Sequence, residues 1–213
     1  GYGGERKLKF ALIAMAIIAA LLMAAPSYAE WRAVPADESI KVAQDKIEVV
    51  PNMEWNRSTA SSAKFGETWT ADGVALNELT FFAAVEEGDT LYWNRIFGSD
   101  KLPVFKSDML LPEIPELFEK SNRLLLDTPV FTIEKVEADR LSGYPAVRFS
   151  YRYAVPDDLL ERRGEAVGAI ANGKLYLVNF VAPSLHYFEH YLPSVRKLFG
   201  SVKLLDTKTE TDD

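Results

Sequence analysis

Segment 163–182 constrains the fold most, because it contains two extended runs separated by Asn172-Gly173. Asn-Gly is the strongest two-residue signal for a β-hairpin, since both residues tolerate the positive φ values that a type I′ turn requires. In the second run one side carries Leu175, Leu177 and Val181, and the other carries Tyr176, Val178, Phe180 and Ala182. Only Asn179 interrupts the apolar residues, whereas a strand with one face in water would alternate. We therefore predict a central strand that is covered on both faces.

The rest of the chain contains further strand patterns that could pair with this hairpin. Strands are predicted at 47–50, 77–85, 130–138 and 146–155. Alternation of apolar residues predicts that Leu79, Phe81, Ala83 and Val85 share one face, and that Val147, Phe149, Tyr151, Tyr153 and Val155 share another. We expect residues 30–39 to be a lead-in segment and residues 92–111 to form a packed loop without regular structure.

Two segments have apolar residues at helical spacing, 112–126 and about 184–202. Pro193 should either kink the second helix or start a new one. Strands, a helix, four consecutive hairpin strands and a last helix predict an α+β fold, a mostly antiparallel β-sheet flanked by helices. We find no linker, so residues 30–205 are expected to be one domain, followed by a polar, disordered tail at 206–213.

Residues 1–29 have the pattern of a secretory signal peptide. Three basic residues precede an apolar run of 16 residues, Phe10 to Ala25, and Ser27-Tyr28-Ala29 places small residues at a cleavage site before Glu30. The alternative is an uncleaved anchor, but the run is shorter than the roughly 20 residues that span a bilayer. We predict cleavage near Ala29-Glu30, so that the chain contacts the membrane only through this segment before cleavage.

Charge and cysteine content narrow the class of protein. The chain has 24 basic and 31 acidic residues, and residues 30–213 keep 21 and 30 of these, a net charge of −9. An acidic chain argues against nucleic acid as a partner. The absence of cysteine excludes disulfides, thiolate catalysis and cysteine-ligated metals. An exported chain of this kind fits a bacterial periplasm, or secretion, better than a disulfide-rich extracellular setting.

The second half resembles a known family. The residues that carry the resemblance are Gly143-Tyr144-Pro145-Ala146, Arg148-Phe149-Ser150-Tyr151, Asn172-Gly173, Leu175-Tyr176-Leu177 with Phe180, and a closing helix with Tyr187, Leu192, Val195, Phe199, Ser201 and Val202. Over about residues 130–205 this pattern is similar to the PsbP-like proteins and their DcrB-type relatives of the bacterial envelope. The resemblance implies an α/β/α sandwich and an accessory role in the envelope, and it transfers no catalytic residue.

The segment His186-Tyr187-Phe188-Glu189-His190 spells H-x-x-E-H, a metalloprotease signature. Residues four apart share a helical face, so His186 and His190 could ligate zinc while Glu189 activates water as a base. A catalytic zinc needs a third protein ligand, and the only later glutamate is Glu210 in the polar tail. The other interpretations are a weak, non-catalytic metal site or two surface histidines.

Aromatic residues form the other candidate site. Trp55, Trp69 and Trp93, with Arg57 nearby, could line a ligand groove or a protein-contact surface, although most such rings fill a core.

We therefore favour a non-enzymatic exported envelope protein, without cofactor, that binds a protein partner or a small ligand. The two alternatives are a zinc-dependent hydrolase built on residues 186–190 and a membrane-anchored structural component.

Overall fold

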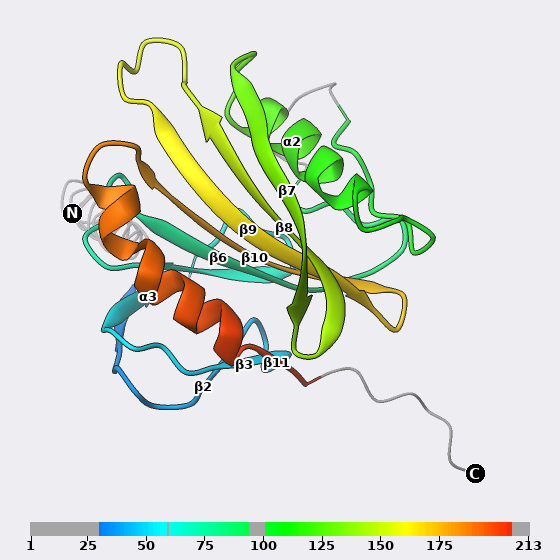
Figure 1. The fold of residues 1–213 in the computed structure, drawn as a ribbon, viewed down its shortest axis with the longest axis horizontal. Helices are drawn as coiled ribbons and strands as arrows, with labels where there is room; N and C mark the ends of the chain where they lie inside the picture. The colour runs from blue at the N-terminus through cyan, green and yellow to red at the C-terminus, as the bar shows by residue number, and fades with distance from the viewer. Residues whose placement is uncertain (1–29, 59, 94–100, 206–213) are drawn as a thin grey trace, which may run out of the picture.

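The computed structural model of the chain describes residues 30–58, 60–93 and 101–205, and its core is one large antiparallel sheet (Figure 1). Eight strands pair in the order β1-β4-β5-β6-β10-β9-β8-β7. Their bounds are β1 Trp31–Val34, β4 Trp55–Ser58, β5 Gly66–Thr70, β6 Glu78–Val85, β7 Phe131–Leu141, β8 Tyr144–Tyr153, β9 Arg162–Ala171 and β10 Lys174–Pro183. A second sheet has the order β11-β3-β2, with β2 Ile40–Val42, β3 Ile47–Val49 and β11 Lys203–Leu204.

Helix α2 (Glu113–Leu125) packs on one face of the large sheet and helix α3 (Tyr187–Ser201) packs on the other (Figure 1). The predicted α+β fold, an antiparallel sheet between helices, is therefore confirmed. Strands β7 to β10 follow one another as consecutive hairpins, as the sequence predicts.

The hairpin of β9 and β10 forms at Asn172-Gly173, whose φ angles are 50° and 72°. Strand β10 lies between β6 and β9 and is covered on both sides. Leu175 and Leu177 belong to the core under α2, whereas Tyr176, Val178, Phe180 and Ala182 belong to the core under α3. The predicted division of this strand into two apolar faces is confirmed.

The α3 side is closed by the helix and by the small sheet together. Phe188, Leu192, Val195, Leu198 and Phe199 are the buried apolar residues of α3. The small sheet adds Val42, Ile47, Val49 and Leu204 to the same core. On this side β10 contributes Tyr176, Val178, Phe180 and Ala182 to the core.

The α2 side is closed over only part of the sheet. The buried apolar side chains of α2 lie toward its first half, where Ile114, Leu117 and Phe118 pack on the sheet. Leu124, Leu125 and Leu126 at its end are only partly buried. The cover therefore thins toward the end of α2, over the sheet near β6 and β10.

Several sequence expectations need correction. Val85 does not share a face with Leu79 and Phe81, because Ala84 has a φ of 53° and the pairing with β10 shifts register there, which turns Val85 toward the α2 core. The expected lead-in segment contains β1, which pairs with β4. These strands have at most four residues, too few for alternation to identify them.

The closing helix begins later than expected, at Tyr187, since His186 has a φ of 69°. Pro193 lies inside this helix, which continues to Ser201 as one element. Residues 92 and 93 and 101–111 of the expected packed loop contain no helix, and Leu102 and Phe105 are buried.

The predicted signal peptide and the predicted tail lie outside the described residues. Among the residues that are described, no helix is long and apolar enough to cross a membrane.

Candidate functional site

The two histidines of the H-x-x-E-H segment lie side by side at the start of α3. His186 and His190 are both exposed, and their rings stack with centroids 5.6 Å apart at an angle of 15°. Glu189 accepts a hydrogen bond of 3.0 Å from Nη1 of Arg163. In the described ranges no group of three or more His, Cys, Asp or Glu side chains could hold a metal ion. The structure thus brings two candidate ligands together, and the zinc site stays a prediction.

The aromatic candidates separate into two places. Trp55 and Trp69 are buried in the α3-side core, with ring centroids 6.4 Å apart. Arg57 forms an ion pair of 2.5 Å with Glu67 beside them. Trp93 is 41% exposed and follows Tyr92, which belongs to the α2-side core. The structure therefore does not gather these residues into one surface, and a binding role for them stays a prediction.

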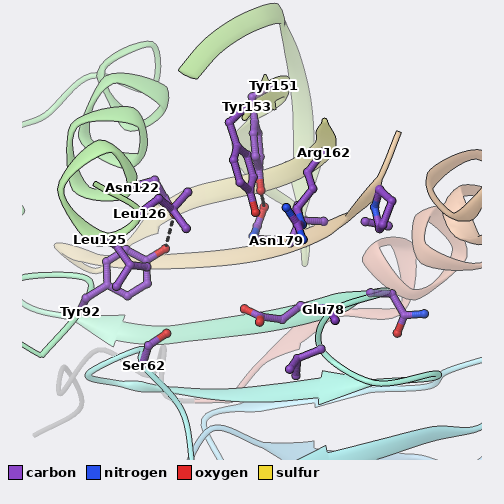
Figure 2. Close-up of a pocket in the computed structure, with 16 residues that line it drawn as sticks. Ser62, Glu78, Tyr92, Asn122, Leu125, Leu126, Tyr151, Tyr153, Arg162 and Asn179 are labelled. Carbon is purple, nitrogen blue, oxygen red and sulfur yellow. Dashed lines mark hydrogen bonds between the residues drawn. The ribbon is translucent and has the colours of Figure 1, made fainter. Parts of the chain in front are cut away.

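A pocket opens on the α2 side of the sheet, where the apolar cover thins (Figure 2). It encloses about 150 Å³. Its polar lining comes from distant parts of the chain and consists of Ser62, Asn77, Glu78, Tyr92, Asn122, Tyr151, Tyr153, Arg162 and Asn179. Its apolar lining includes Val74, Leu125, Leu126 and Val181. Convergent polar groups on apolar walls are typical of small-molecule sites.

Asn179 lies at the base of this pocket and is the residue that interrupts the apolar run of β10. Its Oδ1 accepts a hydrogen bond of 2.6 Å from the hydroxyl of Tyr151, which lies two strands away on β8 (Figure 2). Tyr151 reaches across β9 only because position 164 is glycine. A Cβ at Gly164 would lie 2.1 Å from Cζ of Tyr151. Gly164 on β9 therefore leaves space for the ring of Tyr151, and Asn179 on β10 accepts the hydrogen bond from its hydroxyl.

The tyrosine hydroxyls are held as hydrogen-bonding groups and not as acids. Burial raises the pKa of Tyr151 well above its ordinary value and raises that of Tyr153 to about 12. Tyr92 donates to Oδ1 of Asn122 at 3.0 Å, and burial raises its pKa as well. In the described part of the chain the hydroxyl of Tyr153 has no hydrogen-bond partner. It is therefore available to a molecule in the pocket.

Glu78 supplies the carboxyl group of the pocket, at the start of β6. Burial raises its pKa, and a hydrogen bond of 3.1 Å from the hydroxyl of Thr80 opposes that effect. Among the described residues Glu78 has no ion-pair partner. A partly buried carboxyl group without a cation is costly to ionise, so Glu78 would gain from a ligand that donates to it.

Arg162, at the start of β9, supplies the cation. Its Nη1 donates to Oδ2 of Asp158 at 2.7 Å, and this pairing lowers the pKa of Asp158. The described residues offer no hydrogen-bond acceptor to its Nε and Nη2. Figure 2 shows Arg162 and Glu78 projecting from different strands into the same space. They form no ion pair with each other within the described part of the chain.

Two other hollows are weaker candidates for a ligand site. One of about 240 Å³ lies between α3 and strands β7 to β9, and its charged groups are largely paired with one another, as Arg196 is with Glu165 at 2.8 Å. The other, of about 480 Å³, lies beside Trp55 and Tyr191, whose hydroxyl bonds Asp72. The pocket at Asn179 differs because its carboxyl group, that of Glu78, has no ion-pair partner in the described part of the chain.

Sequence reasoning noticed Asn179 but assigned it no role. The interruption of an otherwise apolar central strand is the signal that could have found the pocket. Its other residues are far apart in the chain, since Glu78, Tyr151 and Arg162 meet only through the strand order β6-β10-β9-β8.

The fold is similar to that of solved proteins. It matches cyanobacterial PsbP (CyanoP) from Synechocystis sp. PCC 6803 with a TM-score of 0.50 and 13% identity, over 84% of this chain and 95% of that one. The PsbP-like fold that the sequence resemblance implies is thereby confirmed. LpqN of Mycobacterium tuberculosis, involved in cell envelope biogenesis, matches with a TM-score of 0.32 and 10% identity over 84% and 92%. No family model and no curated protein matches the sequence.

Proposed function

We propose that this chain is an exported, non-enzymatic protein of the bacterial envelope that binds a small ligand in the pocket at Asn179. The observation that carries the proposal is the hydrogen bond between Tyr151 and Asn179, where the polar residue of an otherwise apolar strand lines a cavity. A polar pair in a core is a specific arrangement that costs stability unless it is fully satisfied. Here it forms one wall of a cavity whose other polar groups, at Glu78 and Tyr153, are left for a ligand.

The pocket favours binding over catalysis. General acid–base catalysis works best with groups whose pKa lies near the working pH. Tyr151 and Tyr153 have raised pKa values and keep their protons near neutral pH. Glu78 alone would have to act as both acid and base. These groups are better suited to hold a molecule than to transform it.

Export is supported by residues 1–29, whose basic start, apolar run and small residues before Glu30 match a signal peptide. The test is N-terminal sequencing of the protein recovered from the periplasmic fraction of a bacterial host. A start at Glu30 is expected. A full-length chain that stays with the membrane would instead support the anchored alternative.

Ligand binding can be tested by blocking the pocket from its rim. Ala75 lines the pocket and is exposed, so Ala75→Trp should fill the entrance at little cost to folding. Ala138→Trp on the exposed face of β7 is the matched control. The measurement is the melting temperature of each variant with the small-molecule fraction of a periplasmic extract. We expect this fraction to stabilise the parent and the control but not Ala75→Trp. Equal stabilisation of all three, or of none, would overturn the proposal.

A further inference from the structure

The ligand class follows from how charge is distributed in this pocket, and the inference rests on the proposed function. Glu78 is on β6 and Arg162 is on β9, with β10 between them. Two strand spacings amount to about 10 Å, and the two side chains form no ion pair within the described residues. The pocket therefore has a negative end and a positive end with a gap between them.

Each end keeps hydrogen-bonding capacity that the described residues do not use. Among those residues, Glu78 accepts a hydrogen bond from the hydroxyl of Thr80 and forms no ion pair. Arg162 uses Nη1 for Asp158, which leaves Nε and Nη2 on the other edge of the guanidinium without an acceptor in the described chain. Two parallel N–H groups on one edge of arginine match the two oxygens of a carboxylate.

The groups between the two ends are neutral. Asn179 on β10 lies between the strands that carry the two ends, and Tyr153 on β8 lies opposite Arg162. An amide and a hydroxyl can both donate and accept hydrogen bonds. The cavity of about 150 Å³ is smaller than the roughly 300–1,000 Å³ of drug-sized ligand pockets. It therefore suits a molecule of few non-hydrogen atoms.

We propose that the pocket binds a small zwitterion, a free amino acid of the size of glycine, alanine or serine, with its ammonium group at Glu78 and its carboxylate at Arg162. A simple anion would meet Glu78 unpaired, and a simple cation would meet Arg162. A zwitterion satisfies both ends, because hydrogen bonds of about 2.9 Å at each side and the short amino-acid backbone together bridge the gap.

The test compares alanine with two molecules that each lack one of its charged groups, propionate and ethylamine. Binding to the mature chain, residues 30–213, is measured by isothermal titration calorimetry at neutral pH. We expect alanine to bind at least tenfold more tightly than either analogue. If propionate or ethylamine binds with the same affinity as alanine, the zwitterion assignment is overturned.

Two variants assign the groups to the two ends. Glu78→Gln should weaken alanine at least tenfold and leave propionate unchanged, so that the preference for alanine over propionate disappears. Arg162→Gln should in the same way abolish the preference for alanine over ethylamine. Glu116→Gln and Lys120→Gln, both exposed on α2, are the matched controls and should change neither preference. A preference that survives both pocket variants would place the amino acid elsewhere.

The outcome also separates this inference from the proposal beneath it. If no amino acid binds but the periplasmic fraction still stabilises the parent and not Ala75→Trp, the ligand class is wrong and the binding pocket stands. If neither stabilises the parent, the pocket holds only water and both proposals fail.

Discussion

Phe180 and Asn179 are neighbours in β10, yet they belong to two different environments. Phe180 is fully buried on the α3 side, where its ring packs on Phe188 with centroids 5.9 Å apart and on Tyr191 at 6.5 Å. Asn179 faces the α2 side, where it bonds Tyr151 and lines a pocket. One strand thus faces a packed, largely apolar core on one side and a polar cavity on the other.

The difference comes from the covers and not from the sheet. On the α3 side the helix is continuous from Tyr187 to Ser201 and the small sheet extends the cover. On the α2 side the apolar contacts of the helix weaken by Leu125, and the polar residues begin where they weaken. The pocket therefore lies where the apolar cover of α2 weakens over the sheet beneath it.

The largest expected loss of stability is on the α3 side of β10. Phe180→Ala removes a fully buried ring and should lower the free energy of unfolding by about 3–5 kcal/mol. Chemical denaturation measures it. Any ligand affinity of the folded fraction should be unchanged, since the pocket lies across the sheet.

The control for this prediction is Leu110→Ala, because Leu110 is 69% exposed. Its truncation should change the free energy of unfolding by less than about 0.5 kcal/mol. A loss at Phe180 no larger than that at Leu110 would mean that the two sides of β10 do not differ in packing.

The next effect concerns the polar pair on the other side. Tyr151→Phe or Asn179→Leu alone should cost about 1–2 kcal/mol, since each leaves a buried polar group without its partner. The double variant should cost less than the sum of the singles by about 1 kcal/mol, because both unpaired groups are then gone. Urea denaturation of the four proteins gives this coupling energy.

Tyr191→Phe is the matched control, because its hydroxyl bonds Asp72 on the α3 side of the sheet. Combined with Tyr151→Phe it should be additive within about 0.5 kcal/mol. A coupling near zero for Tyr151 with Asn179 would mean that water already satisfies both groups and that the pair does not define the pocket.

The sequence predicts the α3-side core well and the pocket poorly. The two faces of β10 and the alternation of β8 follow from spacing, because burial on a pleated strand has a period of two. Alternation predicts the wrong face for Val85, because a positive φ at Ala84 breaks that period and no residue pattern marks an alanine in this conformation. The short β1 and β4 are fixed by pairing at the sheet edge and not by their own composition.

The candidate site residues illustrate the same limit. Tryptophans near an arginine are compatible with a binding surface and with core packing, and Trp55 and Trp69 lie in the α3-side core. The pocket depends instead on strand order, which places Glu78 two strands from Arg162, and on Gly164, whose missing side chain leaves room for Tyr151. Neither the order nor the close approach is visible in local sequence.

The smallest expected effect is the contribution of Glu78 to the pH dependence of stability, which tests the difference between the two sides of the sheet. The pKa of Glu78 is raised by burial above its ordinary value of 4.5. Between that value and the raised native value the folded chain binds the proton and the unfolded chain does not, so stability falls as pH rises. Glu78→Gln cannot ionise and escapes this loss. It should match the parent below pH ~4 and exceed it by about 1 kcal/mol at pH 8, as measured by urea denaturation across pH.

Glu165 is the matched carboxylate on the α3 side of β9. It is 5% exposed, and its two oxygens accept hydrogen bonds of 2.9 and 2.8 Å from Nε and Nη2 of Arg196. Glu165→Gln should therefore destabilise the chain at pH 8, by about 1 kcal/mol, because Arg196 is half exposed and water replaces part of the lost pairing. A gain of stability for Glu78→Gln and a loss for Glu165→Gln at pH 8 would show that the carboxylate on the α3 side is paired and the one on the α2 side is not. If both variants instead destabilise the chain, Glu78 already has a partner. Saturating alanine should then leave the difference in the free energy of unfolding between the parent and Glu78→Gln unchanged, whereas a ligand at Glu78 would close that difference.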